Sequence, residues 1–204
     1  MRQIESTKQN KSRQKTSSVN RSSASFLVVK NAEKNIRTEI SFLNHFLLKR
    51  NIQELDLRMR LFDLSGQLCG DWIEKVCEPR VYVFDPCAEI EADNFFGSIV
   101  VNFESSDNLG VPFSAVIGTI ISSNSVCAVH SYGRELEAFE VGGNLDVDET
   151  HESGWTVRDN NEVSSFAVMH NGSTPALLEI KLQVMNKKNK TLEASVEKQV
   201  DAYE

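Results

Sequence analysis

Hydrophobic and polar residues alternate with a period of two in several stretches of this chain. Ile99, Val101 and Phe103 alternate with polar neighbours, and residues 55–61 alternate leucine and methionine with charged side chains. A period of two is typical of β-strands that bury one face. The pattern therefore predicts amphipathic strands, the second of which ends in a hairpin turn at residues 63–67.

Short apolar runs between turn residues predict further strands. The stretch 95–135 is expected to form three consecutive buried strands and to organise the rest of the chain. The expected strands cover about residues 26–29, 55–61, 68–73, 81–84, 99–103, 113–121, 126–132, 136–141, 166–170, 178–184 and 191–196. So many short strands predict an all-β protein, an antiparallel β-sandwich of the jelly-roll or immunoglobulin-like type.

Two parts of the chain share one order of elements. Near residues 42 and 165, an apolar strand is followed by a polar loop, an amphipathic strand, a turn and a return strand. Four apolar positions coincide at a constant offset: Leu55 with Leu178, Leu57 with Ile180, Met59 with Leu182 and Leu61 with Val184. An internal duplication into two related halves would explain the match. Two unrelated amphipathic hairpins would look the same, so both interpretations stay open.

Charge divides the chain into a tail and a body. Residues 1–24 have scarcely an apolar side chain and are expected to be a disordered basic tail, residues 25–196 the sandwich domain, and residues 197–204 a frayed end. Residues 1–25 hold six basic residues against one acidic residue, so the −7 of the whole chain leaves −12 on the remainder. An acidic body argues against a nucleic-acid-binding face on the fold, and only the tail could contact nucleic acid.

Targeting features and cysteines favour a cytoplasmic protein without a membrane span. No apolar run approaches the roughly 18 residues that a spanning helix needs, and the N-terminus lacks the apolar segment of a secretory signal. Its serine- and arginine-rich composition leaves an organellar transit peptide as an alternative. The cysteines form no CxxC pair, so reduced thiols are expected and a disulfide stays open. Cys127 is expected to be a small core residue.

A group of polar side chains marks a candidate binding site where one predicted strand ends. His130 and Tyr132 share a strand face, and Arg134 and Glu135 follow as the strand leaves the sheet. Polar groups held by a rigid strand can form a binding cluster. The competing interpretation is an ordinary sheet histidine followed by a solvated turn. The acidic loop after this strand contributes the other candidates, which are His151, Glu152 and Trp155.

Two metal-binding interpretations attach to these residues. His130, Ser131, Tyr132, Glu135 and Gly142 resemble in part the first metal-binding motif of cupins, with Tyr132 in place of the second histidine and Glu135 one residue early. The resemblance implies a metal held by His130 and Glu135, with His170 as a late histidine. In the acidic loop, Asp146, Asp148, Glu149 and Glu152 offer the hard oxygen ligands that calcium prefers, although their spacing is not that of an EF-hand.

No catalytic motif appears in the sequence. It holds no GxSxG elbow, no phosphate-cradling glycine loop and no HExxH. The sequence favours a non-catalytic binding or interaction module that recognises a protein or a polar, glycan-like ligand without a cofactor. The alternative is a cupin-like metal-dependent enzyme using His130, Glu135 and His170, so the question of enzyme activity stays open.

Overall fold

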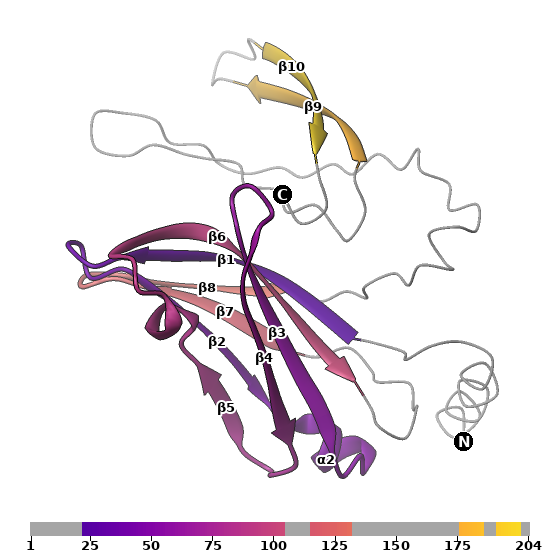
Figure 1. Cartoon of the computed structure of the whole chain (residues 1–204). Coiled ribbons are helices and arrows are strands. Elements are labelled where there is room, and N and C mark those ends of the chain that lie inside the picture. Colours follow the sequence, from indigo (N-terminus) through magenta and orange to yellow (C-terminus); the bar gives the residue numbers. More distant parts are fainter. Residues whose placement is uncertain (1–21, 105–114, 132–175, 186–190, 201–204) are drawn as a thin grey trace, which may run out of the picture. The chain divides into compact units, whose positions relative to one another are not determined.

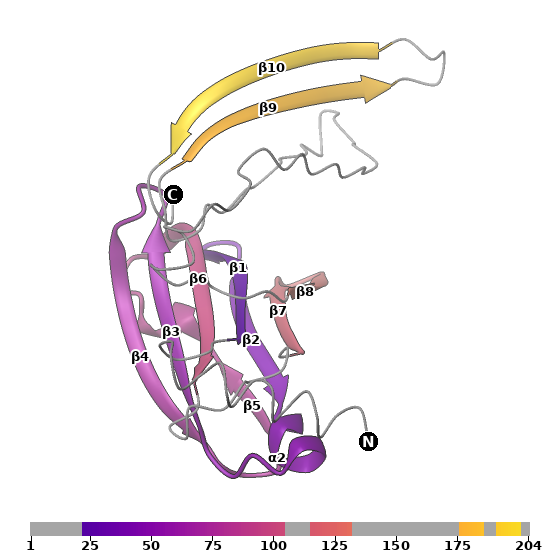
Figure 2. The same cartoon turned by 90° about the vertical axis from the view of Figure 1, so that its right-hand side faces the viewer.

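Two four-stranded antiparallel sheets pack face to face (Figures 1 and 2). The computed structural model describes residues 22–104, 115–131, 176–185 and 191–200. In spatial order, sheet A consists of β1 (Ser22–Asn31), β6 (Asn94–Glu104), β3 (Leu55–Asp63) and β4 (Leu68–Val76). Sheet B consists of β5 (Val81–Phe84), β2 (Arg37–Leu43), β7 (Val116–Ile121) and β8 (Val126–Ser131). The predicted antiparallel β-sandwich is confirmed.

Short connections carry the chain between the two sheets. The helix α2 (His45–Arg50) joins β2 to β3 and is capped by Asn44, whose Oδ1 accepts the N–H of Leu47 at 3.2 Å. The 3₁₀ helix η1 (Pro86–Glu89) follows β5, and Asp85 Oδ1 accepts the N–H groups of Cys87 and Ala88. Such caps satisfy backbone donors that the helices leave free.

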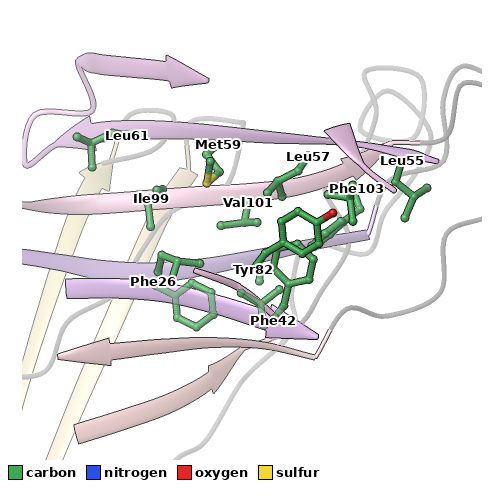
Figure 3. Packing of buried hydrophobic residues seen from close by; sticks show 14 of the residues in the cluster. Phe26, Phe42, Leu55, Leu57, Met59, Leu61, Tyr82, Ile99, Val101 and Phe103 are labelled. Atoms are coloured by element: carbon green, nitrogen blue, oxygen red, sulfur yellow. The ribbon is translucent and has the colours of Figure 1, made fainter. Parts of the chain in front are cut away.

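The predicted alternation decides which residues form the core. Figure 3 shows the inward row of β3 beside the inward row of β6 on one face of sheet A, in the register Leu57↔Phe103, Met59↔Val101 and Leu61↔Ile99. All six side chains are buried in one hydrophobic cluster. On the opposite face of β3, Arg58 Nε donates to Asp71 Oδ1 at 2.9 Å. The strand faces predicted for residues 55–61 are therefore confirmed.

An aromatic cluster joins the two sheets. Phe42 of β2 stacks on Tyr82 of β5, with ring centroids 5.2 Å apart, and meets Phe103 of β6 edge-on at 4.9 Å (Figure 3). Phe46 of α2 lies 5.0 Å from Phe103 between ring centroids. Edge-to-face pairs of this kind add about 0.5–1.5 kcal/mol to the burial of their area. The cluster fixes sheet B, sheet A and α2 to one another.

Hydrogen bonds to buried polar groups lock the adjacent β4–β5 connection. Tyr82 Oη accepts the backbone N–H groups of Cys77 at 3.2 Å and Glu78 at 3.1 Å. Asn44 is also buried, and its Nδ2 donates to the carbonyl of Glu78 at 3.0 Å. Arg80 lies over the Tyr82 ring, 4.3 Å from its centroid. Because buried polar atoms need partners, the connection is held in one conformation.

Three boundaries or burial states differ from the sequence prediction. The first strand begins at Ser22 rather than near Phe26, and Ala24 is buried in the core. Strand β10 (Thr191–Val200) continues past the expected end at residue 196. The expectation that the strand from residue 126 is buried is wrong, because β8 is at the edge of sheet B and its residues 126–130 are exposed.

Sheet A is buried on its outer face as well. Val100 and Phe62 point away from the main cluster, yet both are buried. Asn102, on the same face of β6 as Val100, is also buried, although its position in the alternation predicts exposure. Their burial leaves the centre of this outer face closed to solvent.

The C-terminal part of the chain contains a separate hairpin. Strand β9 (Ala176–Met185) pairs with β10 in a regular antiparallel register from Ala176↔Val200 to Met185↔Thr191. Both amphipathic hairpins that suggested an internal duplication, β3–β4 and β9–β10, therefore form. The duplication itself stays a prediction. Among the described residues, no helix is both long and apolar enough to cross a membrane.

Glycine is required at position 118, where the two sheets approach closely. A Cβ at Gly118 would lie 2.4 Å from Cδ1 of the buried Phe26 ring. Alanine in a strand is ordinarily better than glycine, but here we expect Gly118→Ala to lower the free energy of unfolding by about 1–3 kcal/mol, because overpacking displaces a core ring. Denaturant unfolding measures the change.

The matched control is Gly70→Ala. Its Cβ would meet the far end of the Trp72 side chain at 2.3 Å, and this side chain packs at the rim of the core and is half-buried, so it can shift with less loss than the buried Phe26 ring. A smaller loss is expected there, and Phe26→Leu should partly rescue Gly118→Ala. An unchanged or raised stability of Gly118→Ala would show that the sheets are not held this closely.

Candidate functional site

The outer face of sheet B carries several large apolar side chains that are exposed to solvent. Register sets its composition, because directly paired residues point to the same side of a sheet. One row of this face runs across the four strands through Val83, Ser41, Ile117 and His130. Beside this row, Val81 pairs with Leu43. The face consists of Arg37, Glu39, Ser41, Leu43, Val81, Val83, Ile117, Thr119, Ile121, Val126, Ala128 and His130.

Five large apolar side chains on this face are exposed to solvent. Leu43, Val81, Val83, Ile117 and Val126 have between 40% and 68% of their surface accessible. Four of them lie on neighbouring strands and form a continuous patch at one end of the sheet. The largest contiguous apolar patch on a soluble protein is often an interaction site. In the rest of this article these five residues are called the sheet B patch.

Charged residues lie at the opposite end of the outer face, in the same cross-strand row as Ile121 and Val126. Arg37 Nη2 lies 2.8 Å from Glu39 Oε1, and its Nε lies 3.8 Å from Asp85 Oδ2. The hydrogen bond to Glu39, followed by its negative charge, raises the pKa of the Arg37 guanidinium. Arg37 thus pairs with two carboxylates, so this end of the face is a charged, polar border like the rim of an interface.

His130 is the one member of the predicted polar cluster that lies within the described residues. It is exposed on the outer face of β8, opposite Ile117, and shares this face with Val126 and Ala128. The predicted face of His130 is therefore confirmed. Tyr132, Arg134, Glu135, His151, Glu152 and Trp155 lie outside the described residues, so their convergence with His130 stays a prediction.

Strand β8 adds an open sheet edge beside His130. It pairs with β7 alone within the described part of the chain, and its six residues VCAVHS contain no permanent charge. Val129 is 51% exposed although it points to the inner side of sheet B with Gly118. Uncharged edges rich in β-branched residues can pair with a further strand.

The sequence contains a signal for the sheet B patch, and this signal lies in its apolar rather than its polar residues. Residues 81–84, VYVF, and residues 120–121 are apolar at successive positions rather than at alternate ones. A strand that is apolar at successive positions has two apolar faces, and a two-layer sandwich covers only one of them. The second face therefore had to be either exposed or covered by another part of the protein.

A small open cavity lies at the β1–β2 end of the sandwich. It has a volume of about 250 Å³ and is lined by Lys30, Arg37, Asp85, Cys87 and residues of the turn 31–36. Its charged groups already have partners within the fold. Lys30 Nζ donates to the carbonyl of Ile90, and Arg37 is held by Glu39 and Asp85. The cavity therefore offers a ligand little unsatisfied charge.

All four cysteines are free thiols, and they differ in exposure. Cys87 is buried, whereas Cys69, Cys77 and Cys127 are exposed. The expectation that Cys127 is a core residue is wrong, because β8 extends beyond the cover of sheet A. Burial raises the pKa of the Cys87 thiol. Its Sγ receives the N–H of Thr38 at 3.4 Å and donates to the carbonyl of Val29 at 3.5 Å.

The two metal-binding interpretations depend largely on residues outside the described ranges. Glu135, His170 and the acidic loop at residues 146–152 lie there, so neither interpretation is tested by the fold. Within residues 22–104, 115–131, 176–185 and 191–200, no group of three or more histidine, cysteine or acidic side chains is placed to hold a metal ion.

Comparison with known proteins gives no assignment. The chain matches no family model, no curated protein and no solved structure. The function is therefore argued from the surface of this chain alone.

The reaction rates of the four thiols check which cysteines are buried and which are exposed. In the native protein we expect three thiols to react quickly with a water-soluble disulfide reagent at pH 8. Cys87 should react at least about tenfold more slowly, since burial and a raised pKa both reduce its reactive thiolate. Mass spectrometry of partly labelled protein identifies the slow site. Slow labelling of Cys127 would mean that β8 is covered.

Proposed function

We propose that this protein is a non-catalytic interaction module that binds a protein partner through the outer face of sheet B. The observation that carries the proposal is the sheet B patch, five large apolar side chains exposed on one rigid sheet face. Burial of apolar area is the main driving force of most protein association, at about 25 cal/mol for each Å² removed from water.

The surroundings of the patch support a protein partner over a glycan. Sugar-binding sites need polar groups that converge in a hollow, whereas this face is a sheet surface with exposed aliphatic side chains. His130 and Ser41 add hydrogen-bonding groups within the apolar field. The open edge of β8 beside them supplies backbone donors and acceptors to which a partner strand could pair.

The exposed thiols support a reducing compartment, and we propose the cytoplasm. Cys69, Cys77 and Cys127 are all exposed free cysteines. Exposed thiols persist where glutathione keeps cysteine reduced and are rare in oxidising compartments.

Photo-cross-linking in cells that express the full chain tests the proposed surface. A photoreactive amino acid replaces Ser41, at the centre of the outer face, or Ser65, at the exposed tip of the β3–β4 hairpin. We expect a discrete cross-linked protein from position 41. Ile117→Lys should remove it, because a charge in the centre of an apolar interface costs 2 kcal/mol or more, roughly 30-fold in affinity.

The free energy of unfolding shows whether Ile117→Lys removes the cross-link by disrupting the interface or by unfolding the protein. Ile117 is 40% exposed, so Ile117→Lys should change the free energy of unfolding by less than about 1 kcal/mol. Thr119→Lys, on the same face and strand, is the matched control nearer the polar rim. Cross-links from position 65 but none from position 41 would contradict the proposal and assign binding to the hairpin tip.

A further inference from the structure

The β9–β10 hairpin has one apolar face and one polar face. Its register places alternate residues of the two strands together. One face contains Ala176, Leu178, Ile180, Leu182, Val184, Leu192, Ala194, Val196, Lys198 and Val200. The other face contains Leu177, Glu179, Lys181, Gln183, Met185, Thr191, Glu193, Ser195, Glu197 and Gln199. Nine of the ten positions on the first face are apolar.

A hairpin of this composition requires a covering surface. Two-stranded hairpins are at best marginally stable in water, and a third strand or a packed face is needed to hold them. Ala194 is exposed and Val196 is 56% exposed, whereas Val200 at the end of the same face is 6% exposed. Among the side chains described on this face, Ala194 and Val196 are therefore open to solvent, and Val200 is not.

The outer face of sheet B matches the hairpin in size. At strand spacings of about 4.8 Å and a rise of about 3.3 Å per residue, two ten-residue strands cover roughly 300 Å², and four strands of about six residues cover roughly 400 Å². A stable complex between two copies usually buries about 800 Å² on each partner. The hairpin thus fits within this face, whereas a second protein, either another copy or a different partner, would also have to contact surface beyond it.

The outer face of sheet A is closed to solvent at its centre, although Ile73 and Phe96 on the same face are exposed. Phe62, Val100 and Asn102, on the outer face of sheet A, are already buried. The chain between the sandwich and the hairpin, residues 132–175, has an extended length on the order of 140 Å, which allows the hairpin to reach any face of the same molecule. The sheet B patch is therefore the matching apolar surface within reach.

We propose that the β9–β10 hairpin packs its apolar face on the outer face of sheet B in the free protein, and that a partner displaces it. The first part rests on the exposed sheet B patch, on the apolar pattern of one hairpin face and on the exposure of Ala194 and Val196 there. The second part rests on the proposed function, because it makes the hairpin an intramolecular competitor for the sheet B patch. Binding would then require the hairpin to leave first, which lowers the apparent affinity by the fraction of molecules in the covered state.

Thiol labelling in the full chain tests the covering. Ser41→Cys serves as the reporter in a background where the exposed Cys69, Cys77 and Cys127 are serine. We expect Val196→Asp to raise the labelling rate of Cys at position 41 at least about fivefold, since a charge in the packed face favours local opening. Ser195→Asp, on the polar face of the hairpin, is the matched control and should leave the rate unchanged.

A second variant repeats the test on the same face of the hairpin, and a mass measurement shows whether the cover comes from the same chain or from a second copy. Ala194→Asp should act like Val196→Asp, and circular dichroism should show that the sandwich of both variants is folded. Equal, fast labelling in the parent and in all variants would overturn the proposal. Slow labelling that becomes fast on dilution, with a dimeric mass by ultracentrifugation, would also overturn it, because the cover would then come from a second copy.

The cross-linking experiment distinguishes failure of the covering from failure of the proposed function. If both hold, Val196→Asp raises the yield of the partner cross-link from position 41 about as much as it raises labelling. A partner cross-link that Val196→Asp leaves unchanged overturns the competition and keeps the function. Faster labelling without any partner cross-link overturns the function and keeps the covering.

Discussion

The contact between Phe42 and Phe103 is the interaction on which the rest of the sandwich depends. The two rings meet edge-on at 4.9 Å and come from different sheets, and the stacked Tyr82 and the α2 residue Phe46 surround them. Chain segments far apart in sequence meet at this point, so their closure entropy must be offset by buried area. The close approach at Gly118 follows from the same packing, because the ring of Phe26 occupies the space that a Cβ would need.

The core between the two sheets is built from only the inner face of each sheet. The inner rows of β2, β5 and β7 lie in the core, whereas Leu43, Val81, Val83 and Ile117 in their outer rows are apolar and are covered by neither sheet. Sheet A differs, because its outer row is charged on β3, where Arg58 binds Asp71, and buried on β6 at Val100 and Asn102. The asymmetry explains why the candidate surface lies on sheet B, although both sheets have the same number of strands.

The local rules of strand formation were enough to predict much of the sandwich. The alternation in residues 55–61 and 99–103 identified the inward rows, and the turn at residues 63–67 forms with a positive φ at Gly66, where glycine is favoured. The same rules failed for β8, because the burial of an apolar strand depends on which strands lie opposite it. They also missed the sheet B patch, since exposure of a second apolar face is a property of the layers rather than of any one strand. His130 was placed on the correct face, but its predicted neighbours lie beyond the described residues.

The central claim is that the outer face of sheet B is the surface through which this chain makes its contacts. Methyl NMR of the full-length protein tests this claim most directly. The methyl groups of Val83 and Ile117 report which atoms lie within about 5 Å of the patch, the range of packed side chains across strands. The account predicts nuclear Overhauser effects from these methyls to Val196 and Ala194 in the free protein, and their replacement by signals from a partner on binding. Methyls of Val83 and Ile117 that show contacts only within sheet B, together with full access to a soluble paramagnetic probe in both states, would contradict it.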